Sequence, residues 1–125
     1  MKKIAILTFI FFASNISVYS MYDPDIKFTK TTIDYGKINK GENGIKIFEF
    51  QNNGTSPLKI NQVYSSCGCT IPKKPQNPIM PGDFGEIVVK YDTNRLGLIN
   101  KTITVKSNSK NNPVIFLKIK GEVKQ

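Results

Sequence analysis

The sequence predicts an all-β fold, an antiparallel β-sandwich of about seven strands. After residue 20, apolar and polar residues alternate in short runs, which is typical of strands with one buried face. Gly, Pro and Asn separate these runs at regular spacing over roughly 100 residues, as in sandwiches whose strands are joined by turns. Lysines occupy many of the polar positions, so one face of each strand is expected to contact solvent and the other the second sheet.

The expected strands follow one another along the chain. The first extended segment, residues 26–38, is expected to bend at Tyr35 and Gly36. Residues 77–85 contain two prolines and two glycines and are predicted to form a loop. The predicted extended segments are residues 26–38, 45–52, 58–65, 86–92, 100–108 and 114–123.

Residues 1–20 are predicted to be a cleaved signal peptide. Lys2 and Lys3 precede an apolar stretch at residues 4–13, and small residues precede the predicted cut. An apolar run of about 10 residues is too short for a bilayer-spanning helix, which needs roughly 20. An uncleaved anchor or a buried strand is the alternative interpretation. The mature domain, residues 21–125, is then expected to have no transmembrane span and to be exported to the periplasm, the cell envelope or the extracellular side.

The charge of the chain bears on its partners. A formal net charge of +9 suggests nucleic acid or an anionic lipid surface. However, the lysines are spread along the whole chain and alternate with apolar residues, as expected for the solvent faces of strands. Arg95 is the only arginine, and arginine is the residue suited to bidentate phosphate recognition. We therefore expect no nucleic-acid partner.

The composition argues against an enzyme. The chain contains no histidine, which removes Ser-His-Asp and Cys-His arrangements as well as the commonest metal ligand. The nine carboxylates are scattered, with no candidate acid–base pair. No glycine-rich phosphate loop is present, so we expect no catalytic residues.

The most distinctive stretch holds both cysteines, Cys67 and Cys69, separated by Gly68. Two extended residues separate Cα atoms by at most about 7 Å, whereas disulfides prefer roughly 5.5–6 Å. A slight bend at Gly68 therefore permits a bond. So short a loop would contribute only about 1.6 kcal/mol through chain entropy, which makes it a weak staple for the fold.

Three interpretations of this pair remain open. The first is a disulfide formed after export that pins the end of a strand. The second is a soft-metal site for Cu(I), with Met80 or Met21 as a further ligand; otherwise no cofactor is expected. The third is a thiol–disulfide exchanger, in which Lys73 and Lys74 would favour thiolates if they folded back.

Several short motifs occur in a fixed order, and together they resemble domain-of-unknown-function family 1573, exported bacterial proteins with a CGCT signature. The resemblance covers roughly residues 26–123. It implies an immunoglobulin-like sandwich similar to the abnormal-spindle and major-sperm-protein type, and it supplies no activity. The motif residues are Phe48, Phe50, Asn52, Gly54, Pro57, Leu58, Ile60, Cys67, Gly68, Cys69, Thr70, Pro81, Gly82, Tyr91, Asp92, Gly97, Ser107, Asn108, Leu117, Ile119 and Gly121.

These observations predict an exported, non-enzymatic protein-binding or structural module of the cell envelope, whose partners are other envelope proteins. Binding is expected at an exposed strand edge or at end loops. The loop of residues 66–80 is the candidate surface, since it holds Gly68, Thr70, Lys73 and Lys74 beside the cysteines. The alternative function is soft-metal or thiol-redox handling through Cys67 and Cys69.

Overall fold

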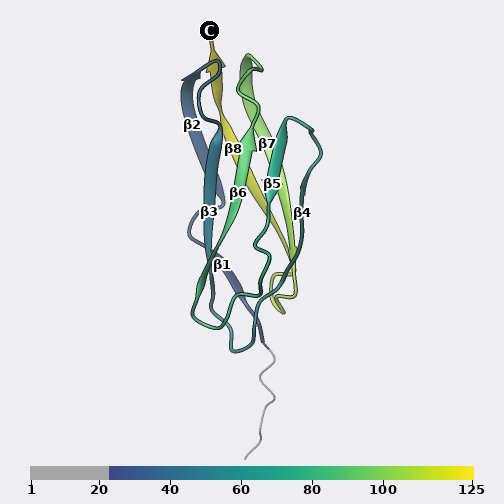
Figure 1. The fold of residues 1–125 in the computed structure, drawn as a ribbon. Coiled ribbons are helices and arrows are strands. Elements are labelled where there is room, and N and C mark those ends of the chain that lie inside the picture. Colours follow the sequence, from purple (N-terminus) through teal and green to yellow (C-terminus); the bar gives the residue numbers. More distant parts are fainter. Residues whose placement is uncertain (1–22) are drawn as a thin grey trace, which may run out of the picture.

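The computed structural model describes residues 23–125, which form two β-sheets packed face to face (Figure 1). The predicted all-β sandwich is confirmed, with eight strands in the described residues. They are β1 (Ile26–Phe28), β2 (Thr32–Asn39), β3 (Ile45–Asn52), β4 (Ile60–Ser65), β5 (Thr70–Lys73), β6 (Phe84–Tyr91), β7 (Gly97–Ser107) and β8 (Val114–Lys124).

Each sheet contains four strands. The β6 sheet has the order β1-β3-β6-β5, and the β7 sheet has the order β2-β8-β7-β4. Neighbouring strands run antiparallel, except that β2 lies parallel to β8. The strands β4 and β5, which end the two orders, follow each other in the sequence and lie on the same side of the sandwich (Figure 1).

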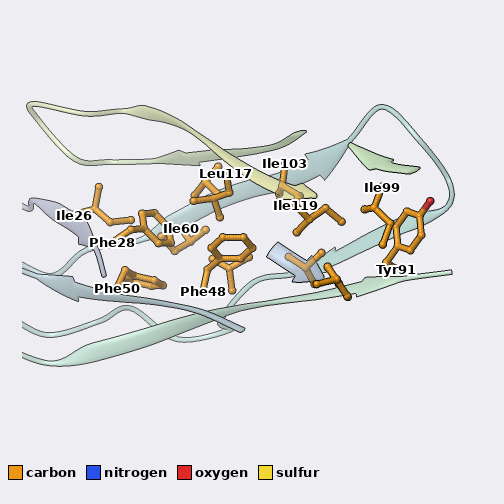
Figure 2. Close-up of a cluster of buried hydrophobic side chains, with 14 of the residues drawn as sticks. Ile26, Phe28, Phe48, Phe50, Ile60, Tyr91, Ile99, Ile103, Leu117 and Ile119 are labelled. Atoms are coloured by element: carbon orange, nitrogen blue, oxygen red, sulfur yellow. The ribbon is translucent and has the colours of Figure 1, made fainter. Parts of the chain in front are cut away.

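The core lies between the two sheets and follows the alternation predicted from the sequence. Phe48 and Phe50 of β3 face Ile103 of β7 and Leu117 of β8, and all four side chains are almost fully buried (Figure 2). The rings of Phe28 and Phe50 pack 5.3 Å apart between centroids. Burying one such side chain contributes about 1.5–3 kcal/mol, so the strand alternation is itself the main source of stability.

The first extended segment is divided between the two sheets. β1 ends at Phe28 and pairs with β3, whereas β2 begins at Thr32 and pairs with β8. The predicted bend is present as a break in the β2–β8 register between Asp34 and Lys37. Gly36 adopts a φ of 68° there, a left-handed conformation that favours glycine.

The predicted loop of residues 66–80 is not loop throughout, because Thr70–Lys73 forms β5 against β6. A four-residue strand with a central proline lacks a clear alternation signal, and only pairing with β6 reveals it. The predicted loop of residues 77–85 is also more ordered than expected. Ile79 forms an isolated bridge with the buried Leu58, and β6 already begins at Phe84.

The predicted signal peptide, residues 1–20, lies outside the described residues. Among residues 23–125 no helix is long and apolar enough to cross a membrane.

Candidate functional site

The two cysteines occupy a tight turn between β4 and β5. Cys67 and Cys69 are joined by a disulfide, and their Cα atoms lie 5.2 Å apart. The N–H of Thr70 donates to the carbonyl of Cys67 at 3.1 Å and closes the turn. The N–H of Asp92 donates to the carbonyl of Cys69 at 2.8 Å, which ties the turn to the end of β6. The turn is therefore held by backbone hydrogen bonds as well as by the disulfide.

The two sulfur atoms have different surroundings. Cys69 is buried, with 6% of its surface exposed, and belongs to the hydrophobic core. Cys67 is only half-buried, at the border of that core. Gly68 between them is exposed, and a Cβ placed on it would meet nothing within 4 Å. The bend that we expected glycine to favour therefore also has room for a side chain.

Arg95 is the cation beside the disulfide. Its Nη1 lies 3.9 Å from Sγ of Cys67, and the N–H of Cys69 donates to the same sulfur at 3.2 Å. The turn that follows β6 holds Arg95, whose N–H donates to the carbonyl of Asp92 at 3.2 Å. This contact is not predictable from the sequence, because 28 residues separate Arg95 from Cys67 and only the pairing of β5 with β6 brings them together.

Lys73 does not fold back over the cysteines as the sequence-based hypothesis for Lys73 and Lys74 required. β5 is extended, and Lys73 stands opposite Val88 at the end of the strand away from the turn. Three residues of strand correspond to about 10 Å, so Lys73 is carried away from the disulfide.

Met80, the candidate third metal ligand, lies at the opposite end of β6. Its carbonyl accepts the N–H of Asp83 just before the strand begins, whereas the cysteine turn contacts the strand's far end. Seven residue steps along β6 correspond to about 23 Å, so Met80 cannot join the cysteines around one ion. Met21 lies outside the described residues. Within residues 23–125 no three or more His, Cys, Asp or Glu residues are grouped for a metal ion.

A surface hollow of about 660 Å³ adjoins the cysteine turn. Its walls come from the loop of residues 41–44, the end of β6 with the turn that follows it, and the start of β5. The lining is mixed in character, with apolar side chains beside charged and amide groups. It includes Ile45, Ile71, Cys69, Lys90, Glu42 and Asp92.

The loop wall of the hollow is held rigidly. The hydroxyl of Tyr35 donates to the carbonyl of Gly44 at 2.6 Å, and the hydroxyl of Thr93 donates to the carbonyl of Glu42 at 2.6 Å. Burial, reinforced by the neighbouring Tyr91, raises the pKa of Tyr35 to about 12. The phenol therefore stays protonated, and remains a donor, throughout the neutral range.

An apolar surface continues from the hollow along the outer face of the β6 sheet. The register places Lys90 between Ile45 and Ile71, and Val88 between Ile47 and Lys73. The three isoleucines are 44–63% exposed. We call this surface the apolar–lysine patch, and it consists of Ile45, Ile47, Ile71, Lys73, Val88 and Lys90.

A known protein family matches nearly the whole of the described chain. The family described as "Protein of unknown function (DUF1573)" matches residues 26–123. No curated protein sequence is similar enough to this chain to count as a match.

Three of the solved structures that resemble this chain illustrate the shared fold. A protein of unknown function from Porphyromonas gingivalis W83 superposes with a TM-score of 0.73 and 19% identity, over 87% of this chain and 51% of that one. The ASH/PapD-like domain 7 of human CEP192 superposes with a TM-score of 0.60 and 10% identity, over 100% of this chain and 98% of that one. The YadV chaperone superposes with a TM-score of 0.58 and 14% identity, over 81% of this chain and 53% of that one. The chain thus spans about half the length of the Porphyromonas protein, and at these identities the likeness shows the fold alone, a PapD-like, immunoglobulin-like sandwich.

Proposed function

The chain belongs to the DUF1573 family of proteins of unknown function, and from that premise we propose that it is a non-enzymatic protein-binding module exported to the cell envelope. The observation that carries the proposal is the apolar–lysine patch with its adjoining hollow. Export rests on the predicted signal peptide of residues 1–20. The chaperone among the similar structures supports protein binding as a use of this fold.

The patch is unusual because its apolar side chains are contiguous. Single exposed apolar residues are common on soluble proteins, but contiguous groups rimmed by polar residues mark interaction sites. Ile47 and Val88 are cross-strand neighbours, and Ile45 and Ile71 flank Lys90 in the next outward-facing row. Four apolar side chains on three adjacent strands therefore form one surface.

The charges of the patch indicate the chemistry of the partner. Lys73 and Lys90 stand among the apolar residues, and the whole chain carries a net charge of +9. Such a surface complements a partner segment that combines apolar side chains with carboxylates. The hollow beside Ile71 offers room for one partner side chain. Pairing along the free edge of β5 is less favoured, because that strand is short and Pro72 has no N–H to donate.

The test is photo-crosslinking in the exporting cell, with a crosslinking amino acid placed at position 71 or, as the control, at position 98. Leu98 is 80% exposed but lies on β7, in the other sheet. We expect a defined envelope protein to crosslink at position 71 and not at position 98. Equal crosslinking at the two positions, or none at position 71, would contradict the proposal.

A binding measurement then tests the chemistry. A peptide covering the crosslinked segment should bind the purified domain, and Ile71→Glu should weaken it at least about tenfold by removing an apolar contact and repelling carboxylates. Leu98→Glu, the matched control, should leave the affinity unchanged. Raising the salt concentration should weaken binding of the peptide to the wild-type domain, because salt screens the attraction between Lys73 or Lys90 and the carboxylates of the peptide.

A further inference from the structure

The Cys67–Cys69 disulfide is asymmetric in the way that thiol-exchanging pairs require. Cys67 is half-exposed. Its Sγ has two N–H donors nearby, the backbone N–H of Cys69 at 3.2 Å and Nη1 of Arg95 at 3.9 Å. Cys69 borders the hollow, but only 6% of its surface is exposed, and its Sγ lies 3.5 Å from the hydroxyl of Thr70. One sulfur can therefore meet an incoming thiol, and the other is shielded from it.

The same asymmetry decides which sulfur carries charge after the bond opens. A thiolate is stabilised by a nearby cation and by N–H donors, and it is disfavoured in apolar surroundings. Arg95 and the Cys69 N–H both act on Cys67. Asp92 is the acid of the Arg95 turn, and its carboxylate already accepts the N–H of Asn94 at 3.0 Å. Cys67 thus has the environment of an attacking thiolate, and Cys69 that of a resolving thiol.

We propose that the pair exchanges disulfides with a protein dithiol, and that Cys67 is the sulfur that forms the mixed disulfide. This activity goes beyond the proposed binding function and does not depend on the apolar–lysine patch. Arg95 is a positioning residue that acts through Cys67.

The exchange balances in two steps. A partner thiolate attacks Sγ of Cys67, a partner–Cys67 bond forms, and the Cys67–Cys69 bond breaks with its electron pair leaving on Cys69, which takes up a proton from solvent to become a thiol. The partner's second thiolate then attacks the partner sulfur of the mixed disulfide and releases Cys67 as a thiolate. Two partner thiols are oxidised to one disulfide, Cys67 and Cys69 are reduced to two thiols, and the two protons pass through solvent. The reverse steps transfer the bond back to the protein.

The turn between β4 and β5 is expected to keep its conformation when the disulfide opens. The Thr70–Cys67 and Asp92–Cys69 backbone hydrogen bonds do not involve sulfur, so the turn remains anchored when the bond opens. An anchored turn keeps the two sulfur atoms close, which favours closure of the disulfide by Cys69 over a long-lived mixed disulfide.

The first experiment compares the two single variants of the full domain after reduction, with glutathione disulfide as the probe and intact mass as the readout. Cys69→Ser retains Cys67, and Cys67→Ser retains Cys69. We expect Cys69→Ser to acquire one glutathione at neutral pH at least about tenfold faster than Cys67→Ser. Equal rates for the two variants, or faster glutathione uptake by Cys67→Ser, would overturn the proposal.

The role of Arg95 is tested in the Cys69→Ser background through the pH profile of the same reaction. Arg95→Gln should slow the reaction at neutral pH and shift the profile to higher pH, with the two rates converging where the thiol is fully ionised. Arg95→Lys should restore part of the neutral rate. A purely structural arginine would leave the pH profile in place, and that result would contradict its assigned role.

A measurement without substitution covers the case in which a variant fails to fold. The reduced wild-type domain is treated briefly with glutathione disulfide, the products are trapped with an alkylating reagent, and peptide fragmentation locates the glutathione. Glutathione on Cys67 supports the proposal, and glutathione mainly on Cys69 overturns it. A synthetic peptide with two reduced cysteines should also be oxidised, one peptide disulfide for each oxidised domain consumed.

Discussion

The two ends of the β6 sheet are closed by different chemistry. At the end where β3 finishes, the buried side chain of Asn52 forms hydrogen bonds with three segments of chain, at residues 25, 54–56 and 79. At the opposite end, the Cys67–Cys69 disulfide closes a turn beside an open hollow. At one end a polar group forms all its hydrogen bonds inside the fold, whereas the disulfide at the other end, whose exchange we propose, includes the half-exposed Cys67.

Both polar atoms of the Asn52 side chain form hydrogen bonds inside the fold. Its Nδ2 donates to the carbonyls of Ser56 at 2.8 Å and Ile79 at 2.9 Å, and its Oδ1 accepts the N–H groups of Gly54 at 2.9 Å and Asp25 at 3.4 Å. The residue is fully buried. A buried amide with complete hydrogen bonding rigidifies its surroundings, so this end is expected to be the less easily opened of the two.

The largest effect is expected when the Asn52 hydrogen bonds are removed. Asn52→Leu keeps the approximate volume but removes the hydrogen bonds from the Asn52 side chain to backbone groups of residues 25, 54, 56 and 79. We expect a loss of about 3–5 kcal/mol in the free energy of unfolding, measured by urea denaturation. Gln51→Leu is the matched control, since it removes one exposed hydrogen bond to Gly82 and should cost less than about 1 kcal/mol. A small loss for Asn52→Leu would mean that the two ends do not differ in this way.

The next effect concerns the hollow and is pH-dependent. The pKa of Tyr35 is raised to about 12, from an ordinary value of 10.0. The folded state thus disfavours the phenolate. The contribution of Tyr35 to the free energy of unfolding is therefore fully present below pH 10, and it falls by up to roughly 2–3 kcal/mol between about pH 10 and 12.

The matched variant for this pH effect is Tyr35→Phe, which loses the hydrogen bond to Gly44 and with it some stability at neutral pH. Denaturation curves of both proteins across this pH range isolate the Tyr35 contribution from that of the lysines and other tyrosines. If both proteins lose the same stability between pH 10 and 12, Tyr35 is not the responsible group.

A smaller effect is expected from opening the disulfide. It closes a loop of only three residues, so reduction should lower the free energy of unfolding by about 1.6 kcal/mol or less. Urea denaturation with and without reductant measures this difference, and the Cys67→Ser/Cys69→Ser variant should show no response to reductant. A loss of more than about 4 kcal/mol would indicate that the disulfide, rather than the core, holds this end together.

The smallest effect is expected at Gly68. It has no positive φ, and a Cβ there meets no atom within 4 Å, so Gly68→Ala should change stability by less than about 0.5 kcal/mol. Thermal denaturation of the oxidised and reduced variant is the measurement. A substantial loss would show that the turn needs glycine's freedom for a conformation other than the closed one.

Much of the fold was accessible from the sequence because it depends on local alternation. Phe48 and Phe50, two residues apart, lie on the same buried face, as do Leu117 and Ile119. The spacing of Cys67 and Cys69 predicts that a slight bend permits a bond between them, as one of three open interpretations, and the structure contains that bond. β5 is not predicted from the sequence, since a four-residue strand with a proline carries too little periodicity. Met80 is too far from the cysteines to be a ligand beside them, because the length of β6 separates them.

By itself, the sequence determined the all-β class, the inward-facing residues of the longer strands and the closeness of the two cysteines, because each depends on residues a few positions apart. Only the tertiary structure decided that β2 runs parallel to β8, that the apolar residues of β3, β5 and β6 form one patch, and that Arg95 lies beside Cys67. These features depend on which strands pair and in which register. Pairing is set by the packing of the whole core, which no local pattern encodes.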